Sequence, residues 1–335
     1  MNLSLNPMLP VLDARISTAG TAAERRAFNE QLRTACYETG AFYLRHHGIA
    51  DGLCRAALAG AERFFALPAE SKARCGIRHS KHFRGYSHLS NARDCREQMH
   101  FGLELPACPN APPGPAQLSG PNLWPAELGD DWRETMTAFL RAADLAGRRL
   151  LAALEPVLSL PPGYFAQQAQ PAPYLLMKLL CYPPSSEPAR QGIAPHCDWS
   201  WLTLLLQQQA GLQVRARNGR WLDAPPVADS LIVNLGELLA LVTAGECHAV
   251  PHQVRLTGSA QPRLSIPVFI NPALPAVITP KPFARATGFA DETALAHVHR
   301  VVAPRASLAP FVFGESEWRR KGLGVWCHDA QCRAD

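Results

Sequence analysis

The chain has 335 residues, of which 47% are hydrophobic and 18% are charged, and its formal net charge at pH 7 is +5. This composition excludes a disordered or collagen-like chain and is typical of a globular protein with a sizeable core. The basic residues are scattered instead of forming a long stripe with stacking aromatic residues, which argues against a nucleic-acid partner.

Residues 1–104 predict two helices, one strand and an irregular segment. A capping box, Thr21-Ala22-Ala23-Glu24, begins a helix whose apolar residues recur at helical spacing until Gly40. A strand follows over residues 41–44, and Asp51 is expected to cap the second helix. We expect residues 74–104 to be irregular, with two short strand-like pieces.

The middle of the chain predicts one long helix. Helical periodicity runs over residues 130–158, and Pro161-Pro162-Gly163 ends it. One or two further helical turns are expected at 238–243, and another helix at about 291–300.

From Tyr174 onward the pattern changes to short β-like runs. They cover residues 175–182, 201–207, 212–215, 221–223, 231–235, 251–256 and 263–270. Asn218-Gly219 is a hairpin signal between two of them. Several short strands at this spacing indicate a barrel or a double-sheet roll.

Ten cysteines show neither a Cys-x-x-Cys pair nor a regular spacing, which excludes the common zinc patterns and a compact disulfide framework. The chain has no apolar run that approaches a membrane span, and its first residues do not resemble a secretory signal. We therefore expect a cytoplasmic protein with no membrane partner, and a monomer.

Two histidines and one aspartate form the most informative pattern. His196 and Asp198 are two residues apart, so in an extended segment their side chains point the same way, while His252 must come from a separate strand. Two imidazoles and one carboxylate can hold Fe(II) and leave positions open for substrate and oxygen. The same ligands could equally hold zinc or manganese, and such a pattern often occurs by chance.

Arg263 and Ser265 narrow these alternatives. They project from one face of a predicted strand, eleven and thirteen residues beyond His252. A guanidinium can grip a carboxylate through two hydrogen bonds, and a hydroxyl can add a third. Upstream, Tyr182 can place its phenol near the same carboxylate. Taken in order with the metal-ligand pattern, these residues point to iron, a small dicarboxylic acid and oxidative chemistry.

Further motifs, taken together, form a highly specific combination. In the second half of the chain they lie at residues 181–183, 192–198, 202–205, 211–214, 221, 233–237 and 263–267. Elsewhere they lie at residues 9–13, 40–44, 47–49, 64–68, 84–86 and 313–315. On these motifs, the chain resembles the iron- and 2-oxoglutarate-dependent oxygenases of the isopenicillin N synthase-like family over most of its length.

The resemblance implies a mainly β fold with flanking helices, in which a double-stranded β-helix (jelly-roll) core follows a helical N-terminal region. The implied divisions are an N-terminal non-haem dioxygenase region over 1–120, a connecting long helix over 121–170, the jelly-roll core over 171–280, and a C-terminal helix and tail over 281–335. It also implies that Fe(II) is bound by His196, Asp198 and His252, and that the distal carboxylate of 2-oxoglutarate is held by Arg263, Ser265 and Tyr182.

The reaction of this family uses O2 to decarboxylate 2-oxoglutarate, which gives succinate and CO2, and to oxidise a small-molecule substrate. Hydroxylation is its commonest outcome, and ascorbate is a candidate reductant. Three alternatives stay open: an iron oxidase that does without 2-oxoglutarate, an ethylene-forming enzyme, and a non-catalytic protein that kept the fold.

Two positions depart from the family pattern. Cys197 stands where threonine is usual, and Gln253 follows His252 where arginine is usual. The Cys197 thiol is expected to project away from the metal. Trp199 is a candidate wall of the substrate cavity. For a prime substrate that is an amino acid or another carboxylate, one or two ligands are expected among His82, Arg84, Arg93, Arg96 and His100.

Overall fold

The computed structural model describes residues 9–107, 112–185, 190–256, 258–281 and 309–321. The helix expected at about 291–300 lies outside these ranges. No helix in the described ranges is both long enough and apolar enough to cross a membrane.

The N-terminal part alternates helices with short strands. Its elements are β1 (Val11–Asp13), α1 (Ile16–Ala19), α2 (Ala22–Glu38), β2 (Ala41–Arg45), α3 (Asp51–Phe65), α4 (Ala69–Arg74), a 3-10 turn (Ile77–His79), β3 (Gly85–Ser90) and β4 (Cys95–Phe101). The predicted capping box is confirmed, because the Glu24 amide donates to Thr21 Oγ1 and the Thr21 amide donates to Glu24 Oε2, at 3.3 and 2.7 Å.

Two predictions for this part are wrong. The residue that caps α3 is Ala50, without a side-chain hydrogen bond, and Asp51 is the first helical residue, where its charge still favours the helix N-terminus. The two strand-like pieces expected within residues 74–104 are confirmed as parts of β3 and β4, but residues 85–101 as a whole are not irregular, since β3 and β4 form an antiparallel pair from Gly85–His100 to Ser90–Cys95. In β4 the consecutive polar residues Arg96, Glu97 and Gln98 place polar side chains on both faces and interrupt the apolar alternation by which a strand is recognised.

The second part consists of one long helix and most of the strands. Its elements are two 3-10 turns (Pro115–Leu118, Ala126–Leu128), α5 (Gly129–Val157), α6 (Tyr164–Gln168), β5 (Leu176–Tyr182), β6 (Gln191–His196), β7 (Leu202–Gln207), β8 (Leu212–Arg215), β9 (Trp221–Asp223), β10 (Ser230–Leu235), α7 (Glu237–Val242), β11 (His252–Arg255), β12 (Arg263–Ile270), β13 (Val277–Ile278), β14 (Phe311–Val312) and α9 (Phe313–Arg320). The seven strands predicted after Tyr174 are confirmed, as is the β8–β9 hairpin. The sequence pattern misses β6, because Gly192 and Pro195 are uncommon inside a strand.

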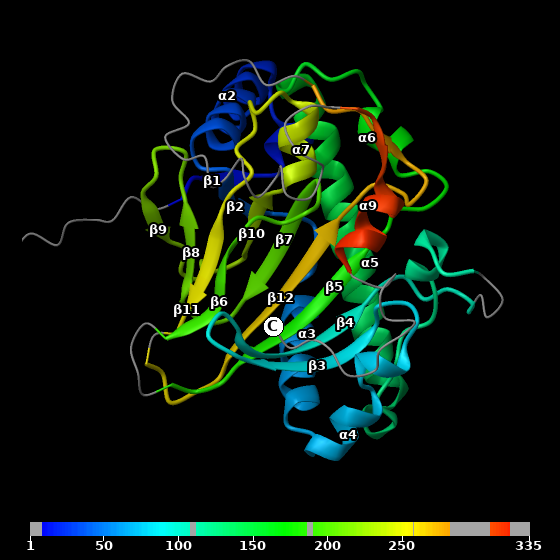
Figure 1. Ribbon diagram of the computed structural model, residues 1–335. Coiled ribbons are helices and arrows are strands. Elements are labelled where there is room, and N and C mark those ends of the chain that lie inside the picture. Colours follow the sequence, from blue (N-terminus) through cyan, green and yellow to red (C-terminus); the bar gives the residue numbers. More distant parts are fainter. Residues whose placement is uncertain (1–8, 108–111, 186–189, 257, 282–308, 322–335) are drawn as a thin grey trace, which may run out of the picture.

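Two sheets face one another (Figure 1). The larger sheet has the strand order β1-β2-β10-β7-β12-β5-β4-β3, and the smaller has the order β6-β11-β8-β9. Helices α2, α3 and α5 cover the outer face of the larger sheet. The expected jelly-roll core with flanking helices is confirmed, and strands β1 to β4 of the N-terminal part extend its larger sheet.

Alternate residues of the larger sheet enter two separate hydrophobic clusters. On β7, Leu204 packs with the helices, whereas Leu205 packs between the two sheets. On β5 the same division separates Leu179 from Leu180. Because successive strand residues point to opposite faces, the larger sheet is buried on both sides, and its inner face forms one wall of a cavity.

Candidate metal centre and cosubstrate site

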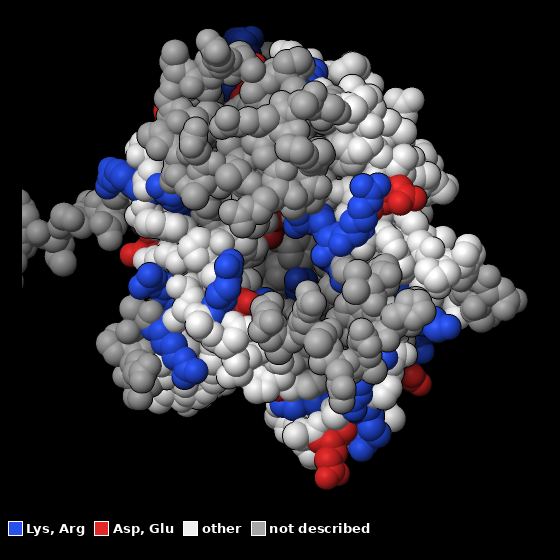
Figure 2. Space-filling view, in the orientation of Figure 1, with Lys and Arg blue, Asp and Glu red and all other residues white. Residues whose placement is uncertain are grey.

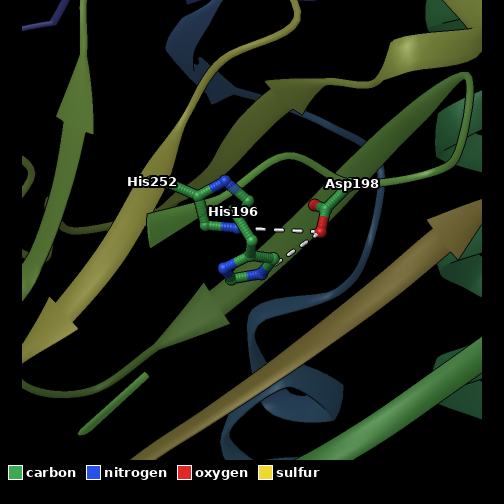
Figure 3. A group of neighbouring side chains, drawn as sticks. All are labelled: His196, Asp198 and His252. Carbon is green, nitrogen blue, oxygen red and sulfur yellow. Dashed lines mark ion pairs between the residues drawn. The ribbon is translucent and has the colours of Figure 1, made fainter. Parts of the chain in front are cut away.

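Three side chains that are far apart in the sequence meet between the sheets (Figure 3). His196 ends β6, Asp198 follows two residues later, and His252 begins β11 directly opposite His196. One ligand atom from each lies within 4.8 Å of the others. Nε2 of each imidazole lies 3.7 Å from Asp198 Oδ1. The structure therefore brings together the three residues that the sequence pattern singles out.

Hydrogen bonds fix the direction of each of these groups. His196 Nδ1 lies 2.9 Å from the Ala194 carbonyl oxygen, and His252 Nδ1 lies 3.1 Å from that of Val250. With these carbonyls as acceptors, each Nδ1 carries the proton, so each Nε2 keeps its lone pair for a metal.

The Asp198 carboxylate is oriented by a neighbouring hydroxyl. Thr203 Oγ1 on β7 donates to Asp198 Oδ2 at 2.6 Å. This hydrogen bond occupies one carboxylate oxygen and leaves the other directed at the two imidazoles.

The protonation states also suit a divalent metal. Burial, and then the adjacent His252, lower the pKa of His196 to about 3. Burial alone would raise the pKa of Asp198, but His252, His196 and the Thr203 hydroxyl lower it overall. At neutral pH His196 is neutral and Asp198 is ionised, which are the forms that bind metals. The residues thus fit Fe(II), whose open three-ligand sites use two histidines and one carboxylate.

A buried guanidinium lies on the same wall of the cavity. Arg263 begins β12, is 5% exposed and pairs with Tyr182 across the sheet, and its Cζ lies 5.1 Å from the centroid of the Tyr182 ring. Its three nitrogens donate to the Ala210 carbonyl (3.0 Å), Ser265 Oγ (3.1 Å) and Gln207 Oε1 (2.7 Å).

All of these acceptors on Arg263 are neutral. Burial lowers the pKa of the guanidinium, yet no carboxylate among the described residues forms an ion pair with it. A buried positive charge without a counter-charge is unfavourable, so this group fits an anionic ligand such as a carboxylate.

The residues that the sequence suggests for substrate binding lie in different places. Arg96 lines the cavity and forms an ion pair with Asp94. Arg84 is buried away from it, since its guanidinium donates to the carbonyl oxygens of His82 (2.9 Å) and Leu118 (3.1 Å).

Two further candidates for substrate binding, His82 and Trp199, do not line the cavity. His82 Nδ1 lies 2.8 Å from the Gln117 carbonyl oxygen. The Trp199 ring stacks on Phe311 at 5.9 Å between centroids.

The side chains at the two positions that depart from the family pattern, Cys197 and Gln253, do not line the cavity either. The Cys197 thiol lies 3.6 Å from the Ala249 carbonyl oxygen, and burial raises its pKa well above the usual range. Gln253 Nε2 donates to Gln213 Oε1 on β8 at 2.9 Å, on the face opposite His252.

Sequence reasoning overlooks several polar residues that line the cavity. They are Gln98, Lys178, Thr203 and Asn234. The alternation of β5 could have identified Lys178, because it lies four residues before Tyr182 and therefore on the same face.

The fold and the site together define a non-haem iron oxygenase, and comparison with known proteins agrees. The model of the 2OG-Fe(II) oxygenase superfamily matches residues 173–272, and a model described as the N-terminal region of non-haem dioxygenases in morphine synthesis matches residues 9–127. A 2-oxoglutarate-dependent dioxygenase of Gibberella zeae is 32% identical over 297 residues, which cover 79% of this chain and 76% of that protein.

A further relative and a solved structure are similar to the chain over most of its length. The 2-oxoglutarate-Fe(II) type oxidoreductase hxnY of Emericella nidulans is 31% identical over 277 residues, covering 78% of this chain and 79% of that protein. The crystal structure of a full-length Neurospora crassa protein in complex with alpha-KG and thymine has a TM-score of 0.76 at 22% identity, and covers 97% of this chain and 99% of that one. The chain belongs to the 2OG-Fe(II) oxygenase superfamily and is an Fe(II)- and 2-oxoglutarate-dependent dioxygenase.

Proposed function

We propose that this enzyme hydroxylates a small molecule, with Fe(II) held by His196, Asp198 and His252 and with the distal carboxylate of 2-oxoglutarate held by Arg263, Ser265 and Tyr182. The observation that carries the proposal is the buried Arg263 guanidinium, whose acceptors among the described residues are all neutral and which lies on the wall of the same cavity as the three metal-ligand residues.

The reaction balances with one molecule of each reactant. One atom of O2 enters succinate as 2-oxoglutarate loses CO2, and the other enters the substrate as a hydroxyl group. Bound iron supplies the redox chemistry that couples these two oxidations.

The residues of the chain provide binding, orientation and exclusion of water. Arg263 and Ser265 would fix one end of 2-oxoglutarate, so that its keto-acid end is presented to the metal. The apolar side chains of Leu205, Leu212 and Val254, which line the cavity, limit the access of water to the reacting groups. The Neurospora crassa neighbour was crystallised with thymine and alpha-KG, which supports a small-molecule substrate.

We also propose that the enzyme is a cytoplasmic monomer and that ascorbate is a candidate reductant. The described cysteines are free thiols, as is usual in a reducing compartment. Size-exclusion chromatography with light scattering tests the monomer, and fractionation of the source cells tests the location.

The test is the replacement of Arg263 by methionine, a side chain of similar length without charge. Because a bound carboxylate would lose its charged partner, we expect its affinity for 2-oxoglutarate to fall by about 2–5 kcal/mol, which is roughly 30-fold or more. Succinate release is measured against 2-oxoglutarate concentration, with added Fe(II) and with a chelator.

The exposed Arg255 on β11 offers a matched control, since Arg255→Met removes a guanidinium from the surface. An unchanged 2-oxoglutarate requirement in Arg263→Met would mean that the cosubstrate binds elsewhere. O2 consumption by the wild type without 2-oxoglutarate would identify an oxidase of the isopenicillin N synthase type, and ethylene in the headspace without added substrate would identify an ethylene-forming enzyme.

A further inference from the structure

Lys178 is a strand residue that faces the cavity and that the proposed reaction does not use. It lies on β5 before Leu180 and Tyr182, and all three side chains line the cavity because alternate strand residues share a face. Its Nζ lies 5.3 Å from the centroid of the Phe269 ring on β12. In Figure 2 the surface is hollowed over this part of the larger sheet, and blue Lys or Arg atoms lie in and beside the hollow.

Lys178 and Arg263 lie at opposite ends of this wall. Tyr182 pairs directly with Arg263, and Lys178 lies four residues before Tyr182 on the same strand. At the rise of an extended strand this separation is about 13 Å. A carboxylate bound by Arg263 is therefore too far away to form an ion pair with Lys178.

The metal-ligand residues lie toward the Lys178 end of the wall. Asp198 accepts the hydrogen bond from Thr203, and Thr203 pairs with Phe269, which is the residue beneath the Lys178 ammonium. A ligand held by Lys178 would thus lie beside the metal-ligand residues.

No carboxylate in the described part of the chain neutralises Lys178. The nearby acids have other partners, since Asp94 pairs with Arg96 and Glu317 pairs with Lys321 at 2.9 Å. Asp198 attracts the ammonium electrostatically, but no hydrogen bond or ion pair between them is formed among the described residues. Burial, and then Lys321 and Arg96, lower the pKa of Lys178 to about 7.

A second polar group at this end is also unsatisfied. His100 lies directly opposite Lys178 in the β4–β5 pair and is 1% exposed. Neither of its ring nitrogens has a hydrogen-bond partner among the described residues. Buried polar groups in folded proteins are usually hydrogen-bonded, so the unpartnered His100 ring beside the half-buried Lys178 amine indicates a ligand with oxygen acceptors.

We propose that Lys178 binds a carboxylate of the prime substrate, which makes the substrate a small carboxylic acid whose carboxylate lies at the end of the cavity opposite the 2-oxoglutarate carboxylate. This inference rests on the proposed function, because it assigns Arg263 to 2-oxoglutarate and leaves Lys178 for a second anion.

The experiment compares matched acids and amides on the protein loaded with Fe(II) and 2-oxoglutarate without oxygen. Titration calorimetry measures the binding of phenylacetate and phenylacetamide, hexanoate and hexanamide, and N-acetylalanine and its amide. We expect each acid to bind at least about tenfold more tightly than its amide, because only the acid pairs with a desolvated ammonium. In Lys178→Met the ratio should fall to about one, and Lys178→Arg should restore part of it.

The exposed Lys81 provides the matched control, since Lys81→Met removes a surface ammonium and should leave the ratio unchanged. Lys178→Met replaces a partly buried charge by an apolar side chain of similar length, so its melting temperature should not fall, which verifies folding.

Two results would overturn the inference. One is the absence of a preference for acids in the wild type, and the other is a preference that persists in Lys178→Met. A weaker affinity for 2-oxoglutarate in Lys178→Met, without such a loss in Arg263→Met, would show that Lys178 holds the cosubstrate instead. Failure of the proposed function is recognised separately, because the wild type would then release no succinate from 2-oxoglutarate.

Discussion

The two faces of the larger sheet are built from alternate residues of the same strands, yet they differ in chemistry. On β12, Ile266, Val268 and Ile270 pack against helices in one apolar cluster. On the opposite face of the same strand, Arg263 and Ser265 line the cavity. A period of two residues thus separates the side chains that hold the fold together from those that bind ligands.

The energetic consequences of the two faces also differ. Burial of apolar area on the helix-facing side is favourable without any ligand. On the cavity side, Arg263 is a buried positive group and Lys178 is a partly buried amine whose pKa is lowered to about 7. No carboxylate in the described part of the chain forms an ion pair with either of them. We therefore expect the helix-facing residues to control the free energy of unfolding and the cavity-facing residues to control ligand affinity.

Two adjacent residues of β12 test this division with the largest expected effect. Ile266→Ala should lower the free energy of unfolding by about 2–5 kcal/mol, because it opens a space in a fully buried cluster. Ser265→Ala, one residue away on the other face, should cost only about 1 kcal/mol of stability through one lost hydrogen bond. Urea denaturation measures both.

The second half of the test is ligand affinity. Ser265→Ala should weaken 2-oxoglutarate binding, whereas Ile266→Ala should leave it unchanged at temperatures where the variant is folded. Equal losses of stability in the two variants would contradict the claim that the helix-facing side controls stability and the cavity-facing side controls ligand affinity.

The helix-facing side of the sheet could be predicted from the sequence, and the cavity-facing side only in part. Apolar alternation identified seven strands, and the spacing of His196, Asp198 and His252 identified residues that meet in space. In β4 the polar residue Glu97 lies between Arg96 and Gln98, so polar side chains occur on both faces and the alternation is interrupted. In β6 a glycine and a proline replace the usual strand residues.

Individual contacts could not be predicted, because they depend on which partner a side chain meets after folding. Arg84 lies in a segment that suggests substrate binding, but backbone carbonyls occupy its guanidinium. Lys178 lies in an apolar strand, and only the register of β5 against β4 and β12 shows that it is beside His100 and Phe269.

A second prediction concerns Thr203, a polar residue on the cavity side of β7. Thr203→Val keeps the shape of the side chain and removes the hydroxyl that donates to Asp198. Loss of a group that orients a metal ligand should weaken Fe(II) binding by about 10- to 100-fold. Anaerobic competition with a coloured chelator measures this affinity.

Thr135 provides the control for this substitution, since it is partly exposed on α5 and donates to a backbone carbonyl of its own helix. Thr135→Val should leave Fe(II) affinity at the wild-type value. If Thr203→Val did so as well, the hydroxyl would have no part in orienting the carboxylate.

The smallest expected effect concerns His248, a buried polar residue outside the cavity. It lies between α7 and β11, and its Nε2 donates to the Arg215 carbonyl oxygen at 2.9 Å. Burial lowers the pKa of His248 to about 4. Unlike Lys178, this residue already has a partner in the fold, so it should affect stability and not ligand binding.

The sign of the pH dependence follows from the two states of His248. In the unfolded chain its pKa is near the ordinary value of about 6.5, so below that pH the unfolded state takes up a proton that the folded state does not. Stability is therefore lost as the pH falls from about 6.5 toward 4, by up to about 2 kcal/mol at about pH 5. His248→Gln keeps an N–H donor for Arg215 but cannot titrate, so its free energy of unfolding, measured in urea without metal, should fall less between about pH 7 and pH 5. His196 also titrates below its usual range but is present in both proteins, so only the difference between them reports on His248, and equal slopes would mean that His248 does not cause this loss.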